Sequence, residues 1–565
     1  MSHMKKINKK TAVIFVGIVL ISIILRFWQL DSVPPSLDWD EASWGYNAYS
    51  ILETGSDEYG KRLPIVIRSF NDYKPALYAY LTIPVIAVLG LTDFAVRFAN
   101  ALFGVFAVIV TYFLAKELFK RRDVALVSMF LMSISPWAIQ FSRFAHEGMV
   151  GLVFNLLFAL FFLKGLKKPV FLSFAAACAA LSLYSYQNEK IFVPLFGLIL
   201  LISFYKEFFS VSKKYLASAF LVGLIMSLPI IWFTFTTPEA FTRAKGASFL
   251  NNPIGVLNIE NYPERLIEDR KNGNFVGLVL DNRRVLYAKA IIGNYLSHYD
   301  PNFLFVKGDA TLRHQPHGMG HLYLIELPFL LIGLYFLFFG KFDRRVKIFI
   351  ILWMLIVPIV ASTTWDVPNA GRTMNFLPAF QIITALGIIG FYKFILGTNL
   401  HKTFKYGIFG GIILIASFNF VYFLNQYFSQ YSYFASPDFQ YGYNQIIPEV
   451  NKLYSNYDKI IVSNEVPLDQ SYIFFLYNLK YPPSDYQKVS TFGEYQTNHS
   501  FDKFEFRRIK AKDYLKSDPS QLLISSPNDF PDEAKSNIIK KIKFFNGETS
   551  VLVVKGLEKS LSPDL

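Results

Sequence analysis

Long apolar runs separated by short polar stretches fill most of this chain. Runs of about the length that crosses a bilayer as a helix occur at residues 12–30, 95–115, 124–142, 149–163, 169–185, 191–205, 215–236, 322–340, 346–361, 374–392 and 406–424. This pattern predicts a polytopic α-helical membrane protein with about eleven transmembrane helices. The first run is too long for a signal-peptide core, and no small-residue cleavage pattern follows it, so we expect it to remain as the first span.

The pattern changes after the last apolar run. Polar helical stretches there alternate with short β-like runs at Lys459–Ser463, Tyr472–Leu476, Leu522–Ile524 and Val551–Val554. We therefore expect three parts: a tag remnant and N-terminal tail at 1–11, a transmembrane domain at 12–424, and an α/β domain outside the membrane at 425–565.

Composition and charge fit this division. The chain of 565 residues is 53% hydrophobic and 17% charged, and its 56 Lys and Arg exceed its 42 Asp and Glu to give a formal net charge of +14. In a soluble protein such an excess would suggest nucleic-acid binding. Here 21 of the basic residues form six clusters beside apolar runs, at 5–10, 116–122, 164–168, 206–214, 341–347 and 393–405. The excess is therefore a topology signal, and the expected partner is the lipid bilayer, with no nucleic acid.

The positive-inside rule also orients the chain. All six clusters are cytoplasmic only if the short apolar segment 77–91, which contains Pro84, is a re-entrant or interfacial helix instead of a span. The N-terminus is then cytoplasmic, and the loops 31–94 and 237–321 and the C-terminal domain face outward. The single cysteine, Cys178, lies in an apolar run, which excludes a disulfide framework and a cysteine-rich metal site.

The first outward loop contains a group of acids beside aromatic residues. Trp39 stands between Asp38 and Asp40, Glu41 follows directly, and Trp44 comes three residues later. Carboxylates accept bonds from hydroxyl or amine groups, and aromatic rings offer flat faces to a polar substrate. The alternative is a solvated acidic loop with interfacial aromatics.

Further along this loop, Tyr73 and Lys74 precede Pro75 and the short apolar segment. A lysine directly before a proline that opens an interfacial helix is held at headgroup depth, where its ammonium can meet a lipid phosphate. An acid pair and a phosphate-seeking cation therefore share one loop.

Together with Arg97 in the second span, these motifs resemble the GT-C superfamily of integral-membrane glycosyltransferases. The chain is most similar to the protein O-mannosyltransferase and aminoarabinose-transferase branch, glycosyltransferase families 39 and 83. The resemblance covers residues 12–200 clearly and 290–390 more loosely. It implies an inverting enzyme at the outer face of a prokaryotic plasma membrane, which moves a sugar from a polyprenyl-phosphate carrier to a hydroxyl or amine of a protein, lipid or glycan.

The resemblance also implies roles for single residues. Asp40 occupies the position of the catalytic base, Glu41 lies beside it, and Asp38 is a competing assignment. Glu147 stands where relatives place a second active-site acid. The implied contacts to the donor phosphate are Lys74, Arg143, Arg313 and Arg372, and the implied substrate contacts are Trp44, Tyr73, His146 and His314. The alternatives are snorkelling or interfacial anchoring for the arginines and simple interfacial packing for the histidines.

Metal dependence stays open. Four of the eight histidines lie within 298–321, but their Pro/Gly-rich loop supplies no helical register, which disfavours a zinc site. We expect either no cofactor or a divalent cation held by Asp40 and Glu147.

Two other functions compete with the proposed sugar transfer. One is an oligosaccharide transferase with a pyrophosphate-linked donor. The other is a lipid or polysaccharide transporter or flippase, for which the sequence offers no repeated halves.

Overall fold

The computed structural model describes residues 9–70, 72–237, 240, 246–251, 261–490 and 498–557. The chain divides into two compact units. Unit 1 comprises residues 1–28, 102–142 and 147–423, and unit 2 comprises residues 29–101, 143–146 and 424–565. The first outward loop predicted from the sequence thus belongs to the same unit as the C-terminal region.

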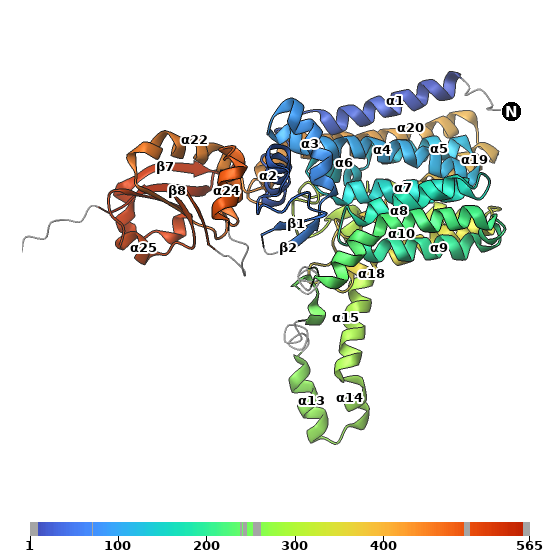
Figure 1. Cartoon of the computed structure of the whole chain (residues 1–565). Coiled ribbons are helices and arrows are strands. Elements are labelled where there is room, and N and C mark those ends of the chain that lie inside the picture. Colours follow the sequence, from blue (N-terminus) through green and yellow to red (C-terminus); the bar gives the residue numbers. More distant parts are fainter. Residues whose placement is uncertain are drawn as a thin grey trace, which may run out of the picture. The chain divides into compact units, whose positions relative to one another are not determined.

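Unit 1 is helical (Figure 1). It contains α1 (Lys9–Phe27), α5 (Arg122–Ile134), α6 (Pro136–Arg143), α7 (Gly148–Gly165), α8 (Phe171–Leu183), α9 (Glu189–Phe209), α10 (Lys213–Thr236), α16 (Glu326–Phe339), α17 (Arg344–Ile356), α18 (Pro358–Ala361) and α19 (Ala379–Gly397). It also contains part of α4 (Asp93–Phe119) and most of α20 (Lys402–Asn425), and the last residue of α6 belongs to unit 2. Helices α16 and α19 approach closely because each presents a glycine. A Cβ on Gly333 would lie 1.9 Å from the Ile383 carbonyl oxygen, and one on Gly387 would lie 1.8 Å from the Phe329 carbonyl oxygen.

Seven helices of the described chain are long and apolar enough to cross a membrane, or eight if the pair α5 and α6, bent by 53°, is one span. The eleven predicted runs all fall on helices, but those at 169–185 and 322–340 form the shorter apolar helices α8 and α16. The run at 346–361 is divided between α17, of 13 residues, and α18, of four, and neither is long enough for a full span. The segment 77–91 forms α3 (Leu77–Leu89), which has 13 residues and contains Pro84. Its length suits the predicted interfacial or re-entrant position better than a full span.

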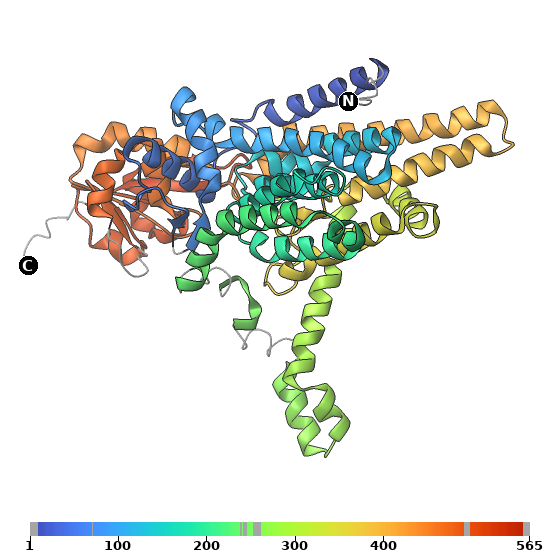
Figure 2. The ribbon, with the colours of Figure 1, turned by 45° about the vertical axis from the view of Figure 1, so that its right-hand side comes forward.

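A helical arm extends from the bundled helices of unit 1 (Figures 1 and 2). It consists of α13 (Tyr262–Lys271), α14 (Phe275–Leu280) and α15 (Arg283–Ser297). Asn282 caps α15, since its side chain accepts hydrogen bonds from the backbone N–H groups of Arg284 and Val285.

Unit 2 joins the first loop to an α/β fold. The loop contributes α2 (Trp39–Thr54), the hairpin β1 (Val66–Ser69) and β2 (Asp72–Pro75), and α3, and the C-terminal region contributes α22 (Tyr443–Leu453), β3 (Lys459–Val462), α23 (Ser471–Asn478), α24 (Pro483–Val489), β4 (His499–Phe501), β5 (Phe504–Phe506), α25 (Ala511–Leu515), β6 (Gln521–Ser525), β7 (Ile538–Lys543) and β8 (Thr549–Lys555). The six strands β3 to β8 form one sheet in the order β4-β5-β3-β6-β8-β7. Strand β3 runs parallel to both of its neighbours, and the other pairs are antiparallel.

Helix α2 of the loop packs against α23 and α24. The Tyr46 hydroxyl donates to the Tyr481 carbonyl at 3.0 Å, and the Gln487 amide donates to the Ser50 and Thr54 hydroxyls at 3.1 and 3.0 Å. The run Tyr472–Leu476, predicted as a strand, lies in α23 and is buried throughout. The prediction was wrong because a short, continuously apolar run has no period that separates a buried strand from a buried helix.

Candidate functional site

The acids of the first loop lie at the start of α2 and have three different environments. Asp38 is the N-cap, and its carboxylate accepts a hydrogen bond from the Glu41 backbone N–H at 2.9 Å. The Glu41 carboxylate accepts one from the Asp38 backbone N–H at 3.3 Å, which completes a capping box. Asp38 is 3% exposed, so its carboxylate supports the helix and has little access to a substrate.

Glu41 is fully buried and forms an ion pair with Arg97. The Arg97 Nε and Nη2 atoms lie 2.9 Å from the two carboxylate oxygens, and both side chains are 0% exposed. The Ala145 backbone N–H donates to the same carboxylate at 2.7 Å. Glu41 therefore joins α2, α4 and the segment 143–146 within unit 2, and its carboxylate is occupied by these contacts.

Asp40, in contrast, is about one-third exposed and forms an ion pair with Lys74. Lys74 is buried, and its ammonium lies 5.5 Å from the centres of the Trp44 and Phe70 rings. Both aromatic rings attract the cation, and Asp40 neutralises it. Of the three acids, Asp40 is the one whose carboxylate is both accessible and next to a cation.

The structure corrects the predicted position of Lys74. The residue lies on strand β2, where it pairs with Ile67, and α3 begins three residues later at Leu77. A β-hairpin, instead of the first turn of an interfacial helix, therefore holds the ammonium. Tyr73 precedes it on the same strand opposite Arg68, and the Trp44 ring lies 5.6 Å from that of Tyr78.

The remaining predicted residues of unit 2 lie in the segment 143–146. Arg143 is fully buried, and its Nη2 atom donates to the carbonyls of Gln29 at 3.0 Å and Val33 at 2.8 Å. Its guanidinium also lies 5.0 Å from the Phe428 ring centre. These contacts fix the entry of the first loop, and they leave Arg143 poorly placed to reach a donor. His146 is half-buried, with its ring 5.5 Å from that of Phe144.

Glu147, Arg313, His314 and Arg372 belong to unit 1. Glu147 is buried at the position that precedes α7. His314 donates to the Asp309 carboxylate at 2.5 Å and packs against Phe141 with ring centres 5.1 Å apart. The carbonyl of Arg313 accepts a hydrogen bond from the Gln140 amide at 2.6 Å.

Asp309 connects this loop to the one that contains Arg372. Its carboxylate accepts a hydrogen bond from the Ala370 backbone N–H at 3.0 Å as well as from His314. Burial raises the pKa of the Asp309 carboxyl, but His314, His321 and the hydrogen bond from the Ala370 backbone together lower it more, so the pKa lies below its usual range. The structure therefore brings the loops of His314 and Arg372 together.

The Arg372 guanidinium donates to the Thr364 hydroxyl at 2.8 Å and to the Asp366 carbonyl at 3.2 Å. Its own carbonyl accepts a hydrogen bond from the Asn188 amide at 3.2 Å. A deeper network supports this loop, because Glu189 accepts from Asn155 at 2.6 Å and from Asn375 at 2.9 Å. The sequence signal for this network is a polar Asn155 inside an apolar run, which our site prediction omitted.

Two histidines of the 298–321 segment, His298 and His321, are buried. His321 is fully buried between the Trp137 and Phe303 rings, at 4.8 and 4.7 Å, and burial lowers its pKa to about 4. His298 accepts a hydrogen bond from the Asn369 backbone N–H at 3.2 Å through Nε2. Within the described residues, no three His, Cys, Asp or Glu side chains are grouped so that they could hold a metal ion.

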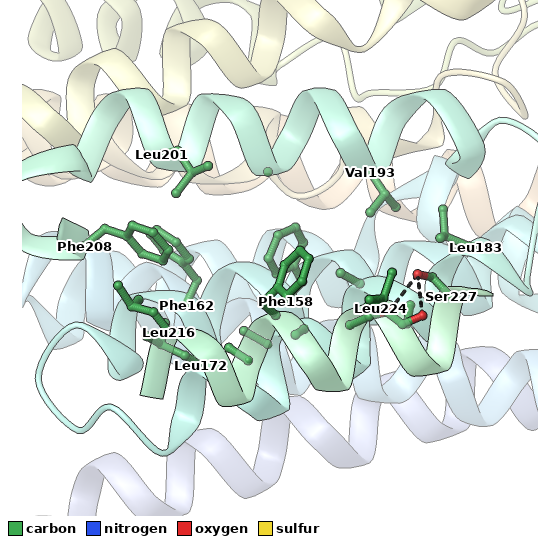
Figure 3. Close-up of a pocket in the computed structure, with 18 residues that line it drawn as sticks. Phe158, Phe162, Leu172, Leu183, Val193, Leu201, Phe208, Leu216, Leu224 and Ser227 are labelled. Atoms are coloured by element: carbon green, nitrogen blue, oxygen red, sulfur yellow. Dashed lines mark hydrogen bonds between the residues drawn. The ribbon is translucent and has the colours of Figure 1, made fainter. Parts of the chain in front are cut away.

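Unit 1 also contains an apolar pocket among α7, α8, α9 and α10 (Figure 3), with a volume of about 460 Å³. Phe158, Phe162, Leu201 and Leu224 are among its lining residues. Ser227 is the one polar residue of the lining, and its hydroxyl donates to the Gly223 carbonyl at 2.7 Å. The pocket therefore suits a hydrocarbon chain better than a polar group.

Comparisons with known proteins agree with the fold of a helical membrane protein. Residues 73–233 match the family of dolichyl-phosphate-mannose-protein mannosyltransferases. No curated protein matches the sequence. Among solved structures, the Archaeoglobus fulgidus oligosaccharyltransferase in the apo form is similar with a TM-score of 0.52 and 14% identity over 84% of this chain. This chain spans 64% of the length of that protein.

ArnT from Cupriavidus metallidurans, solved with undecaprenyl phosphate, matches with a TM-score of 0.52 and 13% identity. The match covers 97% of this chain and 98% of ArnT. AglB from Archaeoglobus fulgidus, solved with an inhibitory peptide and a dolichol-phosphate, has a TM-score of 0.50 and 12% identity over 83% of this chain and 63% of that one. At sequence identities this low, the comparison shows a similar fold and nothing about activity.

Proposed function

We propose that the chain is a member of the GT-C superfamily of integral-membrane glycosyltransferases, and that it transfers one sugar from a polyprenyl-phosphate carrier to an acceptor hydroxyl or amine. The transfer inverts the anomeric carbon and takes place at the outer side of a prokaryotic plasma membrane. The N-terminus is then cytoplasmic and the C-terminal domain extracytoplasmic. The acceptor is a protein, a lipid or a glycan.

One observation carries the proposal: Asp40 is the accessible acid of α2, and the buried Lys74 ammonium lies against it. In the reaction, the acceptor oxygen or nitrogen forms a bond to the anomeric carbon while the bond from that carbon to the phosphate oxygen breaks. Asp40 takes the acceptor proton, and the phosphate leaves with the bonding electrons. Positive charge beside the departing phosphate stabilises the transition state.

The ion pair gives Lys74 a second role in this scheme. Before the donor binds, the ammonium neutralises Asp40. A donor phosphate competes for the ammonium, and the carboxylate that it releases becomes a stronger acceptor for the proton. Arg313 and Arg372 are the proposed further contacts to phosphate, Glu147 and Glu41 the proposed supporting acids, and Trp44, Tyr73, His146 and His314 the proposed contacts to sugar or acceptor.

The apolar pocket of unit 1 supports a lipid-linked donor. A polyprenyl chain is a branched hydrocarbon, and the aromatic and aliphatic lining offers it dispersion contacts without polar groups to desolvate. ArnT was solved with a carrier of this class, undecaprenyl phosphate. We propose that the pocket takes part of the carrier chain.

The second candidate is an oligosaccharide transferase with a pyrophosphate-linked donor and a divalent cation, held by Asp40 and Glu147. The likeness to the archaeal oligosaccharyltransferase favours it. The two matches cover different shares of the other protein: nearly all of ArnT, but 64% of the oligosaccharyltransferase. We therefore place the monosaccharide transfer first.

The test uses purified protein, polyprenyl-phosphate-mannose and related donors, and measures donor consumption and donor binding. We expect Lys74→Ala to weaken donor binding by about 10-fold to 100-fold, the size of one hydrogen bond between charged groups. Lys74→Arg is the matched control and retains most of the binding. Arg313→Ala and Arg372→Ala test the other two cations in the same assay. Unchanged binding in all three alanine variants would refute the phosphate site.

A further inference from the structure

The arm formed by residues 262–297 leaves large apolar side chains exposed. At its tip, on α14, Phe275 is 75% exposed, Val276 64% and Leu280 58%. On α15, Val285, Ile292 and Leu296 are 40%, 58% and 59% exposed. Exposed apolar surface of this extent on a soluble face is unusual and marks contact with a partner or with lipid.

The exposed residues of α15 lie on one side of the helix. Val285, Ile292 and Leu296 are spaced by seven and four residues, which places them in one stripe along the axis. The other side is already packed, because Leu286 is buried against Phe249, and the Tyr287 ring stacks on the Phe249 ring at 6.2 Å. The open stripe is therefore a separate surface of the helix and not a loosely packed core.

Basic residues surround this apolar surface. Arg270 and Lys271 end α13 just before the tip, and Arg283 and Arg284 begin α15 just after it, and all four are exposed. An apolar face flanked by Lys and Arg is the pattern of helices that lie in the headgroup region of a membrane, where the cations meet lipid phosphates.

The base of the arm is attached where the bundled helices end. Near the C-terminal end of α17, the carbonyls of Leu355 and Met354 accept hydrogen bonds from the Tyr295 and Tyr299 hydroxyls, each at 2.7 Å. The Asn294 amide donates to the Ser362 carbonyl at 3.2 Å, just after α18. Figures 1 and 2 show the arm leaving sideways from this end of the bundle. A helix that leaves a membrane-spanning bundle sideways at its end follows the bilayer surface.

From these four observations we propose that the arm is an interfacial anchor, which lies on the bilayer with the tip of α14 and the stripe of α15 in the lipid. The arm contacts the outer-leaflet lipid around the spans, and its basic residues bind the headgroup phosphates. Through Asn294 and His298 the anchor also fixes the loop that contains Arg372. The proposal goes beyond the glycosyltransferase activity and does not depend on the identity of the donor.

Site-specific fluorescence in lipid nanodiscs tests the anchor. Cys178 is the single cysteine of the sequence and is buried, so a thiol introduced at an exposed position can be labelled selectively. We choose Val276→Cys and Ile292→Cys for the arm, and Asp532→Cys, whose side chain is 89% exposed, as the water-exposed reference. Each variant carries an environment-sensitive dye in nanodiscs of phosphatidylethanolamine and phosphatidylglycerol.

We expect lipid-attached nitroxides to quench the dyes at 276 and 292, at a depth of about 5–10 Å below the headgroups, and iodide in the buffer to leave them bright. The dye at 532 should show the opposite behaviour. Iodide quenching at 276 and 292 equal to that at 532 would overturn the proposal. Protection from both quenchers would also overturn it, because a protein, such as a second copy of the chain, would then cover the arm.

Discussion

Arg97 and Glu41, 56 residues apart in the sequence, form a double ion pair with both N···O distances at 2.9 Å and no exposure of either side chain. The adjacent acid, Asp40, is accessible and pairs with Lys74 instead. Two neighbouring carboxylates on one helix thus have separate tasks, one in the interior of unit 2 and one at its surface. Substitutions at the two positions should separate stability from activity.

Asp40→Asn should abolish most of the transfer and lower the unfolding midpoint less than Glu41→Ala does, because Asp40 is about one-third exposed and an asparagine can still accept a hydrogen bond from Lys74. Loss of a general base lowers the rate by roughly 100-fold to 10,000-fold, while asparagine preserves the size of the partly exposed side chain. The measurement is the initial rate of donor consumption, with the thermal unfolding midpoint in detergent recorded on the same sample. A rate close to that of the unchanged protein would remove the catalytic assignment.

Glu41→Ala should have the opposite signature. It leaves the buried Arg97 guanidinium without its counter-charge, which costs about 3–5 kcal/mol. The unfolding midpoint should therefore fall clearly below that of Asp40→Asn, and the yield of folded protein in detergent should decrease. A midpoint equal to that of Asp40→Asn would contradict the structural role of the ion pair.

Stability should depend on Glu58 above pH 6.5. Burial raises the pKa of its carboxyl to about 8, against about 4.3 in an unfolded chain, and a hydrogen bond from Asn47 offsets part of the shift. Between these values the folded state keeps a proton that the unfolded chain releases, so the free energy of unfolding decreases as pH rises toward 8.

The window from pH 6.5 to 8 isolates this group from the buried histidines. Burial lowers the pKa of His499 to about 4, so it is largely neutral in both states at these pH values, and below pH 6.5 it acts in the opposite direction. Unfolding midpoints measured across the window should decline for the unchanged protein and stay flatter for Glu58→Gln. Parallel declines in the two proteins would show that another group is responsible.

Filling the apolar pocket should discriminate between donors by chain length. Ala176 lines the pocket, and a phenylalanine there occupies space that we assign to the carrier. Ala176→Phe should raise the apparent KM for a long-chain polyprenyl donor several-fold and leave a short-chain analogue nearly unaffected. Equal effects on both donors would place the carrier chain elsewhere.

Chelation tests the cation question. In the proposed reaction the charge beside Asp40 comes from Lys74, so EDTA should leave the transfer rate unchanged. If EDTA removes the activity and Mg²⁺ or Mn²⁺ restores it, the second candidate with its divalent cation becomes the better explanation.

Much of the fold follows from the sequence, because apolar length and flanking charge act over short stretches. All eleven apolar runs are helical, and the strands near Lys459, Leu522 and Val551 formed as expected. The roles of Asp38 and Glu41 are harder to predict from the sequence. The cap formed by Asp38 depends on local backbone angles, and the ion pair of Glu41 depends on Arg97, 56 residues away. The position of Lys74 on a strand could not be predicted either, because its pairing with Ile67 depends on the geometry of the hairpin.

The discontinuity of unit 2 has a consequence for synthesis. The segment with Asp40 leaves the ribosome early, yet Tyr46 bonds to a residue made 435 positions later, and Ser50 bonds to one made 437 positions later. A chain that stops before α23 therefore holds every proposed catalytic residue but lacks the partners of α2. Completion of translation is in this way a condition for assembling the loop that contains Asp40.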